Sequence, residues 1–137
     1  MIVSYTKLPS RNPVYPAFWR PLLGIELSHG VKTIPVKGII DTGADYTLMN
    51  KQIAEQLGIA WDTGRKSPTM GITGTAVVAY IHDVEIEIIR LKNSKRKIPV
   101  AFIDSANVGI LLGQIGFFDN FLVRFDYPKK IFAVELP

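Results

Sequence analysis

The chain is predicted to fold as a single all-β, barrel-like domain. Short runs of alternating apolar and polar residues recur along the sequence and are bounded by Gly, Pro, Asn and Asp, which is typical of strands joined by turns. Apolar residues make up 47% of the chain and charged residues 20%, a balance that supports a buried core. Because 137 residues suit one core better than two, we expect one compact unit in which strands outnumber helices.

Residues 1–21 are predicted to form an irregular N-terminal arm, and residues 22–137 the folded domain. The arm shows neither a strand period nor a helix period, and it carries prolines at positions 9, 13, 16 and 21 among aromatic residues.

Successive hairpins are predicted after the arm. Their strand pairs are 22–27 with 31–40, 67–70 with 77–81, 84–88 with 98–102, and 122–125 with 131–136. The basic segment 92–97 is interpreted as the turn of the third hairpin, and the apolar run 108–112 as a strand buried on both faces.

Two short helical segments are also predicted. Asn50 is expected to cap a helix over Lys51–Leu57, which Gly58 ends. A helical turn is expected at Phe117–Phe121.

The segment Gly38–Met49 carries the most informative ionisable residue. Asp41 directly follows an apolar strand and precedes Thr42 and Gly43, so its carboxylate is expected in a tight loop at the edge of the core. The triplet Asp-Thr-Gly is weak evidence alone, because it recurs at Asp62–Gly64. The flanks of that second copy are polar and indicate an exposed turn.

With its flanks, the first copy resembles the active-site loop of the retropepsins, the single-domain aspartic peptidases of retroviruses and their cellular and bacterial relatives. Two further segments follow in the family's order. Met70–Gly74 is similar to the glycine-containing flap tip, and Gly109–Gln114 to the strand that closes behind the catalytic loop. The resemblance spans roughly Leu22–Leu136 and implies a closed acid-protease barrel.

The resemblance also implies roles for individual residues. Asp41 would be catalytic, Thr42 would hydrogen-bond across a subunit interface, and Gly43 would let the backbone approach substrate. Main-chain binding of a peptide substrate would fall to Ala44 and Asp45. The residues expected to fold over that substrate are Met70, Gly71, Ile72, Thr73 and Gly74.

One such loop per chain has a chemical consequence. Peptide hydrolysis by this route needs two carboxylates that share a proton, one accepting a proton from water and the other donating to the scissile carbonyl. A chain with one suitable aspartate can supply both only as a homodimer, so we expect an Asp41/Asp41′ dyad that acts on polypeptides at mildly acidic pH. No cofactor is expected.

The chain departs from the retroviral pattern at two positions. Ile72 stands where glycine is common, and Gln114 where the family carries an arginine or asparagine; that arginine braces the carboxylate that corresponds to Asp45. Arg20 and Arg124 are considered as substitutes. These departures motivate the alternative that the chain is a non-catalytic peptide-binding or dimerisation module of the same fold.

Other classes of function are not favoured. The formal charge is +4, but no aromatic residues interleave with the basic clusters, so nucleic-acid binding is not expected. His29 and His82 lack metal-ligand spacing, and no metal site is expected. The sequence shows no signal peptide and no membrane span, so neither membrane association nor export is expected and a cytoplasmic location is predicted.

Overall fold

The computed structural model describes residues 1–70 and 76–137. In chain order its strands are β1 (Ile2–Ser4), β2 (Thr6–Pro9), β3 (Ala17–Arg20), β4 (Leu22–His29), β5 (Lys32–Ile40), β6 (Leu48–Asn50), β7 (Arg65–Met70), β8 (Ala76–Ile88), β9 (Arg96–Ile103), β10 (Ile110–Leu112), β11 (Leu122–Asp126) and β12 (Ile131–Glu135). The helix α1 (Lys51–Gln56) follows β6, and a 3₁₀ helix covers Trp61–Thr63.

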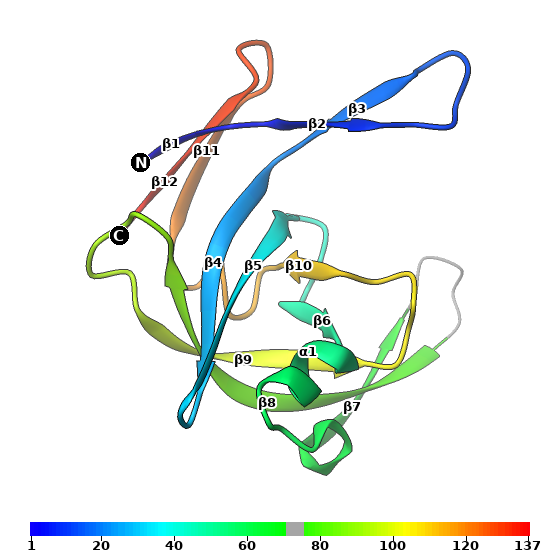
Figure 1. Cartoon of the computed structure of the whole chain (residues 1–137), viewed down its shortest axis with the longest axis vertical. Helices are drawn as coiled ribbons and strands as arrows, with labels where there is room; N and C mark the ends of the chain where they lie inside the picture. The colour runs from blue at the N-terminus through cyan, green and yellow to red at the C-terminus, as the bar shows by residue number, and fades with distance from the viewer. Residues whose placement is uncertain (71–75) are drawn as a thin grey trace.

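Six of the strands close into a barrel in the order β4-β5-β10-β6-β9-β8, with β8 returning to β4 (Figure 1). Strand β7 adds to the outer edge of β8. The predicted all-β fold with a closed barrel is therefore confirmed.

All of the predicted hairpin pairings form. Strand β4 pairs antiparallel with β5, β7 with β8, β8 with β9, and β11 with β12. The two predicted strands at 77–81 and 84–88 are one continuous strand of 13 residues, because β8 runs uninterrupted from the β7 hairpin to its pairing with β4. One long strand thus carries both the flap-like hairpin and a wall of the barrel.

The closing strand β10 lies between two strands from the first half of the chain. It pairs parallel with β5, placing Leu112 opposite Ile40, and antiparallel with β6. Gly38 makes the close approach to β5 feasible, because a Cβ there would lie 2.9 Å from side-chain atoms of Ile110 and Leu112. Strand β10 therefore ends beside the residue that precedes Asp41.

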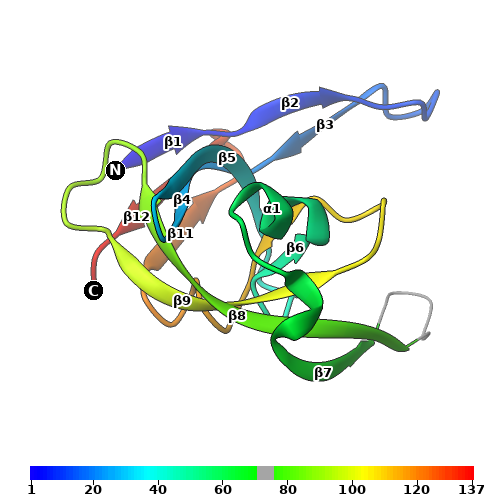
Figure 2. The same ribbon diagram turned by 60° about the horizontal axis from the view of Figure 1, so that its bottom comes forward.

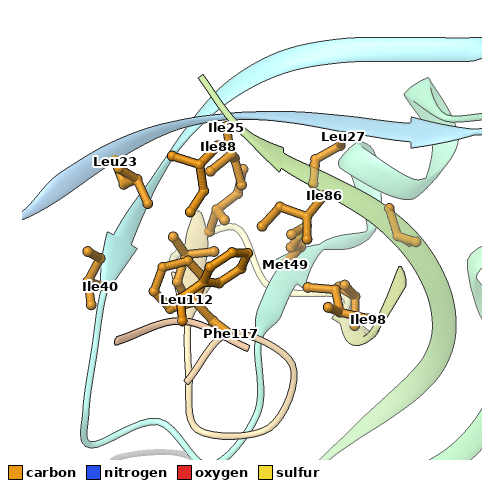
Figure 3. Close-up of a cluster of buried hydrophobic side chains, with 14 of the residues drawn as sticks. Leu23, Ile25, Leu27, Ile40, Met49, Ile86, Ile88, Ile98, Leu112 and Phe117 are labelled. Carbon is orange, nitrogen blue, oxygen red and sulfur yellow. The ribbon is translucent and has the colours of Figure 1, made fainter. Parts of the chain in front are cut away.

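Alternate side chains of the barrel strands fill its interior (Figure 3). Leu23, Ile25 and Leu27 of β4 face Ile86 and Ile88 of β8, and all five are at most 1% exposed. Complete burial of such a side chain contributes roughly 1.5–3 kcal/mol, so this period-two pattern fixes the register of both strands. The barrel is thereby a firm support for the loop at its rim.

The arm is not irregular, which corrects the prediction from sequence. Strand β1 pairs with β12, forming the sheet β1-β12-β11, and β2 pairs with β3 as a separate hairpin. The pairing of β1 joins opposite ends of the chain and leaves no local period, while the prolines fall at the end of β2, in the hairpin loop and just after β3. The division at residue 22 stays a prediction.

The helix predicted over Lys51–Leu57 is confirmed as α1, which ends one residue earlier at Gln56, and the Asn50 side chain accepts a hydrogen bond from the Gln52 amide at its N-terminus. The predicted helical turn at Phe117–Phe121 is a hydrogen-bonded turn and not a regular helix, and the amides of Asn120 (3.0 Å) and Phe121 (3.1 Å) both donate to the Phe117 carbonyl. Within the part of the chain that the structure describes, no helix has the length and apolar character needed to cross a membrane.

Candidate active site

Asp41 lies at the first position after β5, where the buried end of the strand meets a solvent-facing loop. Ile40 before it is 4% exposed, whereas the Asp41 side chain is half-buried. The Asp41 amide donates to the Leu112 carbonyl (3.0 Å), and its Oδ1 accepts from the Gly43 amide (2.9 Å). The bond to Leu112 of β10 therefore fixes the backbone of Asp41. The bond from Gly43, within the loop, fixes the Asp41 carboxylate.

The segment after β10 holds this loop from behind. The Gln114 amide donates to the Ala44 carbonyl (2.9 Å), and the Ile115 amide to the Asp45 carbonyl (2.8 Å). The side-chain amide of Gln114 donates to the Thr42 carbonyl (2.8 Å). Three bonds thus immobilise the Thr42–Asp45 backbone, and the Gln114 side chain supports the main chain of the loop.

Gly113 permits the close contact between these segments. A Cβ at Gly113 would lie 2.7 Å from the Ala44 carbonyl oxygen and closer still to that of Tyr46. The Gly113 amide donates to the buried hydroxyl of Thr47 (3.3 Å). Thr47 was not singled out from the sequence, although a hydroxyl within the apolar run after Asp45 was an available signal.

The structure brings the four predicted residues that follow Asp41 into this single loop. Thr42, Gly43 and Asp45 are exposed and Ala44 is half-buried, so the side of the loop away from β10 faces solvent. A Cβ at Gly43 would lie 3.3 Å from Asp41 Oδ1, so glycine leaves the carboxylate uncrowded.

The predicted flap is described only in part. Met70 ends β7 and pairs with Ala76 at the start of β8, so the strands of a hairpin are in place. Gly71, Ile72, Thr73 and Gly74 lie outside the described residues, and their role stays a prediction.

Neither arginine considered as a brace for Asp45 forms that contact among the described residues. Arg124 pairs with Glu135 (2.7 Å), and the Arg20 guanidinium lies over the Phe18 ring, 5.1 Å from its centroid. The proposed substitution by Arg20 or Arg124 is thus wrong for the single chain.

The second Asp-Thr-Gly copy takes a different structure. Asp62 is exposed on the 3₁₀ helix Trp61–Thr63, which confirms the predicted turn.

The His82 side chain is hydrogen-bonded within the fold, with its Nε2 atom 2.8 Å from the Trp61 carbonyl oxygen. No group of three or more potential metal ligands is found in residues 1–70 and 76–137.

A family model described as "gag-polyprotein putative aspartyl protease" matches residues 29–117, about two thirds of the chain. The match contains the Asp41 loop, the β7–β8 hairpin and β10. The chain belongs to this retropepsin-like aspartyl protease family.

Solved structures of retropepsin-like proteins share the fold. A retropepsin-like aspartic protease from Rickettsia conorii is 19% identical, with 97% of this chain and 99% of that chain covered and a TM-score of 0.61. The EIAV protease, solved in complex with the inhibitor HBY-793, is 23% identical. The match covers 69% of this chain and 81% of the EIAV protease, with a TM-score of 0.52. No curated protein matches the chain. The family and fold of this retropepsin-like chain support protease activity in general.

Proposed function

We propose that the chain is a homodimeric aspartic endopeptidase in which Asp41 of each subunit contributes one carboxylate to a shared dyad. The observation that carries this proposal is the Asp41 loop itself. It places one half-buried carboxylate at the end of a barrel strand, where the Gly43 amide holds the carboxylate and β10 holds the Asp41 backbone. The protease family of the chain supports the same chemistry.

Hydrolysis needs one proton shared between the two carboxylates. The ionised Asp41 accepts a proton from water as the water attacks the scissile carbonyl carbon, while the protonated Asp41 of the other subunit donates to the carbonyl oxygen. When the tetrahedral intermediate collapses, the amine leaves with a proton and the dyad is again singly protonated. The hydrogen bond from the Gly43 amide fixes the orientation of the Asp41 carboxylate.

The loop also provides the peptide-binding groups of this proposal. Thr42 hydrogen-bonds to the second subunit and locks the two loops together, Gly43 admits the substrate backbone, and Ala44 and Asp45 bind its main chain. The segment Met70–Gly74 folds over the bound peptide and excludes water from the dyad.

The two Asp-Thr-Gly copies allow a matched test by substitution. We expect Asp41→Asn to lower cleavage of a peptide library, assayed between about pH 4 and 7, by a factor of about 1,000 or more, because the dyad loses its shared proton. Asp62→Asn removes the same charge from the same triplet on the exposed 3₁₀ helix and should leave cleavage within about twofold of wild type.

Cleavage that persists unchanged in Asp41→Asn would contradict the assigned role. The alternative, a non-catalytic peptide-binding or dimerisation module, predicts that a wild-type dimer binds peptides or a pepstatin-like inhibitor and cleaves none of the library.

A further inference from the structure

The β2–β3 hairpin leaves the barrel next to the Asp41 loop. Pro21, directly after β3, accepts a hydrogen bond from the Ile40 amide (3.0 Å), and Leu22 pairs with Ile39. From this root the hairpin extends away from the barrel, as Figure 1 and Figure 2 both show. The root of the hairpin therefore lies beside the strand that leads into Asp41.

The hairpin and its neighbour are basic. Residues 1–25 contain Lys7, Arg11 and Arg20 but no carboxylate, and the turn between β11 and β12 adds Lys130. Among the described residues, none of these four cations takes part in an ion pair. Lys129 differs, because it pairs with Asp126 (2.9 Å).

Aromatic rings hold two of these lysines on one face of the hairpin. Lys7 is directly opposite Trp19 in the β2–β3 register, and the Nζ atoms of Lys7 and Lys130 each lie 5.9 Å from the centroid of the Trp19 ring. Lys130 Nζ also lies 3.2 Å from the centroid of Tyr127. A ring takes up one side of an ammonium group, so its three N–H donors are not all used.

This basic hairpin face, defined as Lys7, Trp19, Tyr127 and Lys130, has no role in the hydrophobic core. Within residues 1–70 and 76–137, the side chains packed on the core include Tyr5 at the hairpin root, but neither Trp19 nor Tyr127. Trp19 is half-buried, and the exposed Tyr127 ring meets the Tyr5 ring edge-on, with centroids 5.5 Å apart. Packing against Tyr5 therefore accounts for the position of the Tyr127 ring, but not for the two lysines that lie close to the Trp19 ring.

We propose that the basic hairpin face binds an acidic segment of the polypeptide substrate outside the cleavage site. This inference rests on the proposed peptidase function and adds the charge class of the substrate. Carboxylates complement two lysines held on one ring, and the ring steers them into a narrow range of positions. Nucleic acid fits less well, because Lys130 already covers a Tyr127 ring face on which a base would stack.

The test measures binding separately from cleavage, using the full-length Asp41→Asn chain. Fluorescence anisotropy at pH 7 compares a labelled octaglutamate peptide with an octaglutamine peptide. We expect octaglutamate to bind at least about tenfold more tightly and to lose about tenfold in affinity between roughly 50 and 300 mM NaCl.

Substitutions then locate the binding. Lys7→Gln/Lys130→Gln should weaken octaglutamate binding at least about tenfold. The matched control, Lys92→Gln/Lys95→Gln, removes the same charge from the turn between β8 and β9 and should change affinity less than about twofold. Circular dichroism verifies that each variant folds, and Lys7→Gln alone, at an exposed position, gives the same comparison if the double variant is unstable.

Three results would overturn the inference: no preference for octaglutamate, an equal loss in both double variants, or tighter binding of a single-stranded oligonucleotide that depends on Lys7 and Lys130. Peptide cleavage is scored independently in the wild-type chain. If the acidic peptide binds and the wild-type chain cleaves nothing, acidic-peptide binding by the basic hairpin face is supported and the proposed peptidase function fails.

Discussion

Gly113 decides how closely the closing strand approaches the Asp41 loop. We predict that Gly113→Ala lowers the free energy of unfolding by several kcal/mol and abolishes cleavage, because its methyl group would collide with the backbone of Ala44 and Tyr46. The matched control is Gly109→Ala, where an added Cβ meets nothing within 4 Å. Urea unfolding and peptide cleavage check both variants, and similar losses at the two positions would contradict the prediction.

At the same scale, the sequence predicted the placement of Asp41 but not its support. A carboxylate after an apolar strand and before glycine indicates a tight loop, and Asp41 occupies one. The bond from Gln114 to the Thr42 carbonyl was not predictable, because it depends on the direction of a main-chain carbonyl 72 positions away. Because the family arginine at the position of Gln114 braces the carboxylate that corresponds to Asp45, the prediction concerned a contact to Asp45 and not to Thr42.

At the scale of elements, α1 depends on its N-cap. Asn50 Oδ1 accepts from the Gln52 amide (2.9 Å), and Asn50 Nδ2 donates to the Ser105 carbonyl. We predict that Asn50→Ala lowers the free energy of unfolding by about 1–2 kcal/mol and that Asn50→Asp, which keeps the cap and loses the donor, costs less. Urea denaturation checks the order, and equal losses in the two variants would show that the bond to Ser105 and not the cap is the dominant one.

The β11–β12 turn carries a pH-dependent pair. The hydrogen bond from the Lys129 side chain, together with its charge, lowers the pKa of Asp126 below 3.8, and Asp126 raises the pKa of Lys129 above 10.5. The carboxylate therefore contributes stability at pH values above 3.8, and that contribution is lost as the pH falls through the lowered pKa. Since both groups are exposed, the effect should be small.

We predict that Asp126→Asn lowers the urea midpoint slightly and equally between about pH 6 and 9, and that the difference from wild type shrinks as the pH falls below 3.8 and through the lowered pKa of Asp126. A difference that grows as the pH falls would contradict this sign.

Hairpins were the elements that the sequence predicted well, because each combines local alternation with a nearby turn. Strand β6 was missed, since three residues between the Asp41 loop and α1 show no period. Strand β1 was missed because its partner β12 lies at the other end of the chain. The rings of Phe117 and Phe121 lie in the core, and their centroids are 5.1 Å apart. Packing of these rings, and not a regular helix, therefore determines the conformation of the segment.

At the scale of the whole molecule, closure of the barrel determines which strands lie beside the Asp41 loop. Pairing of β4 with β8 closes the six strands, and β10 joins the Asp41 strand from the far end of the sequence. Resemblance to a family, together with strand patterns, was enough to predict a closed barrel with a strand behind the Asp41 loop, but not the strand order or the pairing of β4 with β8. The basic hairpin face was not predictable, because its lysines and rings come from segments more than 100 residues apart.

The central claim is that one active site needs Asp41 from two chains, and subunit mixing tests it most directly. Wild-type chain at fixed concentration is equilibrated with an equal amount of Asp41→Asn chain, and the initial rate of peptide cleavage is measured. A shared dyad predicts that mixed dimers are inactive and that the rate falls to about half, and further with more Asp41→Asn chain, whereas added Asp62→Asn chain raises the rate. A rate that is unchanged by any excess of Asp41→Asn chain would show that each chain works alone and would contradict the account.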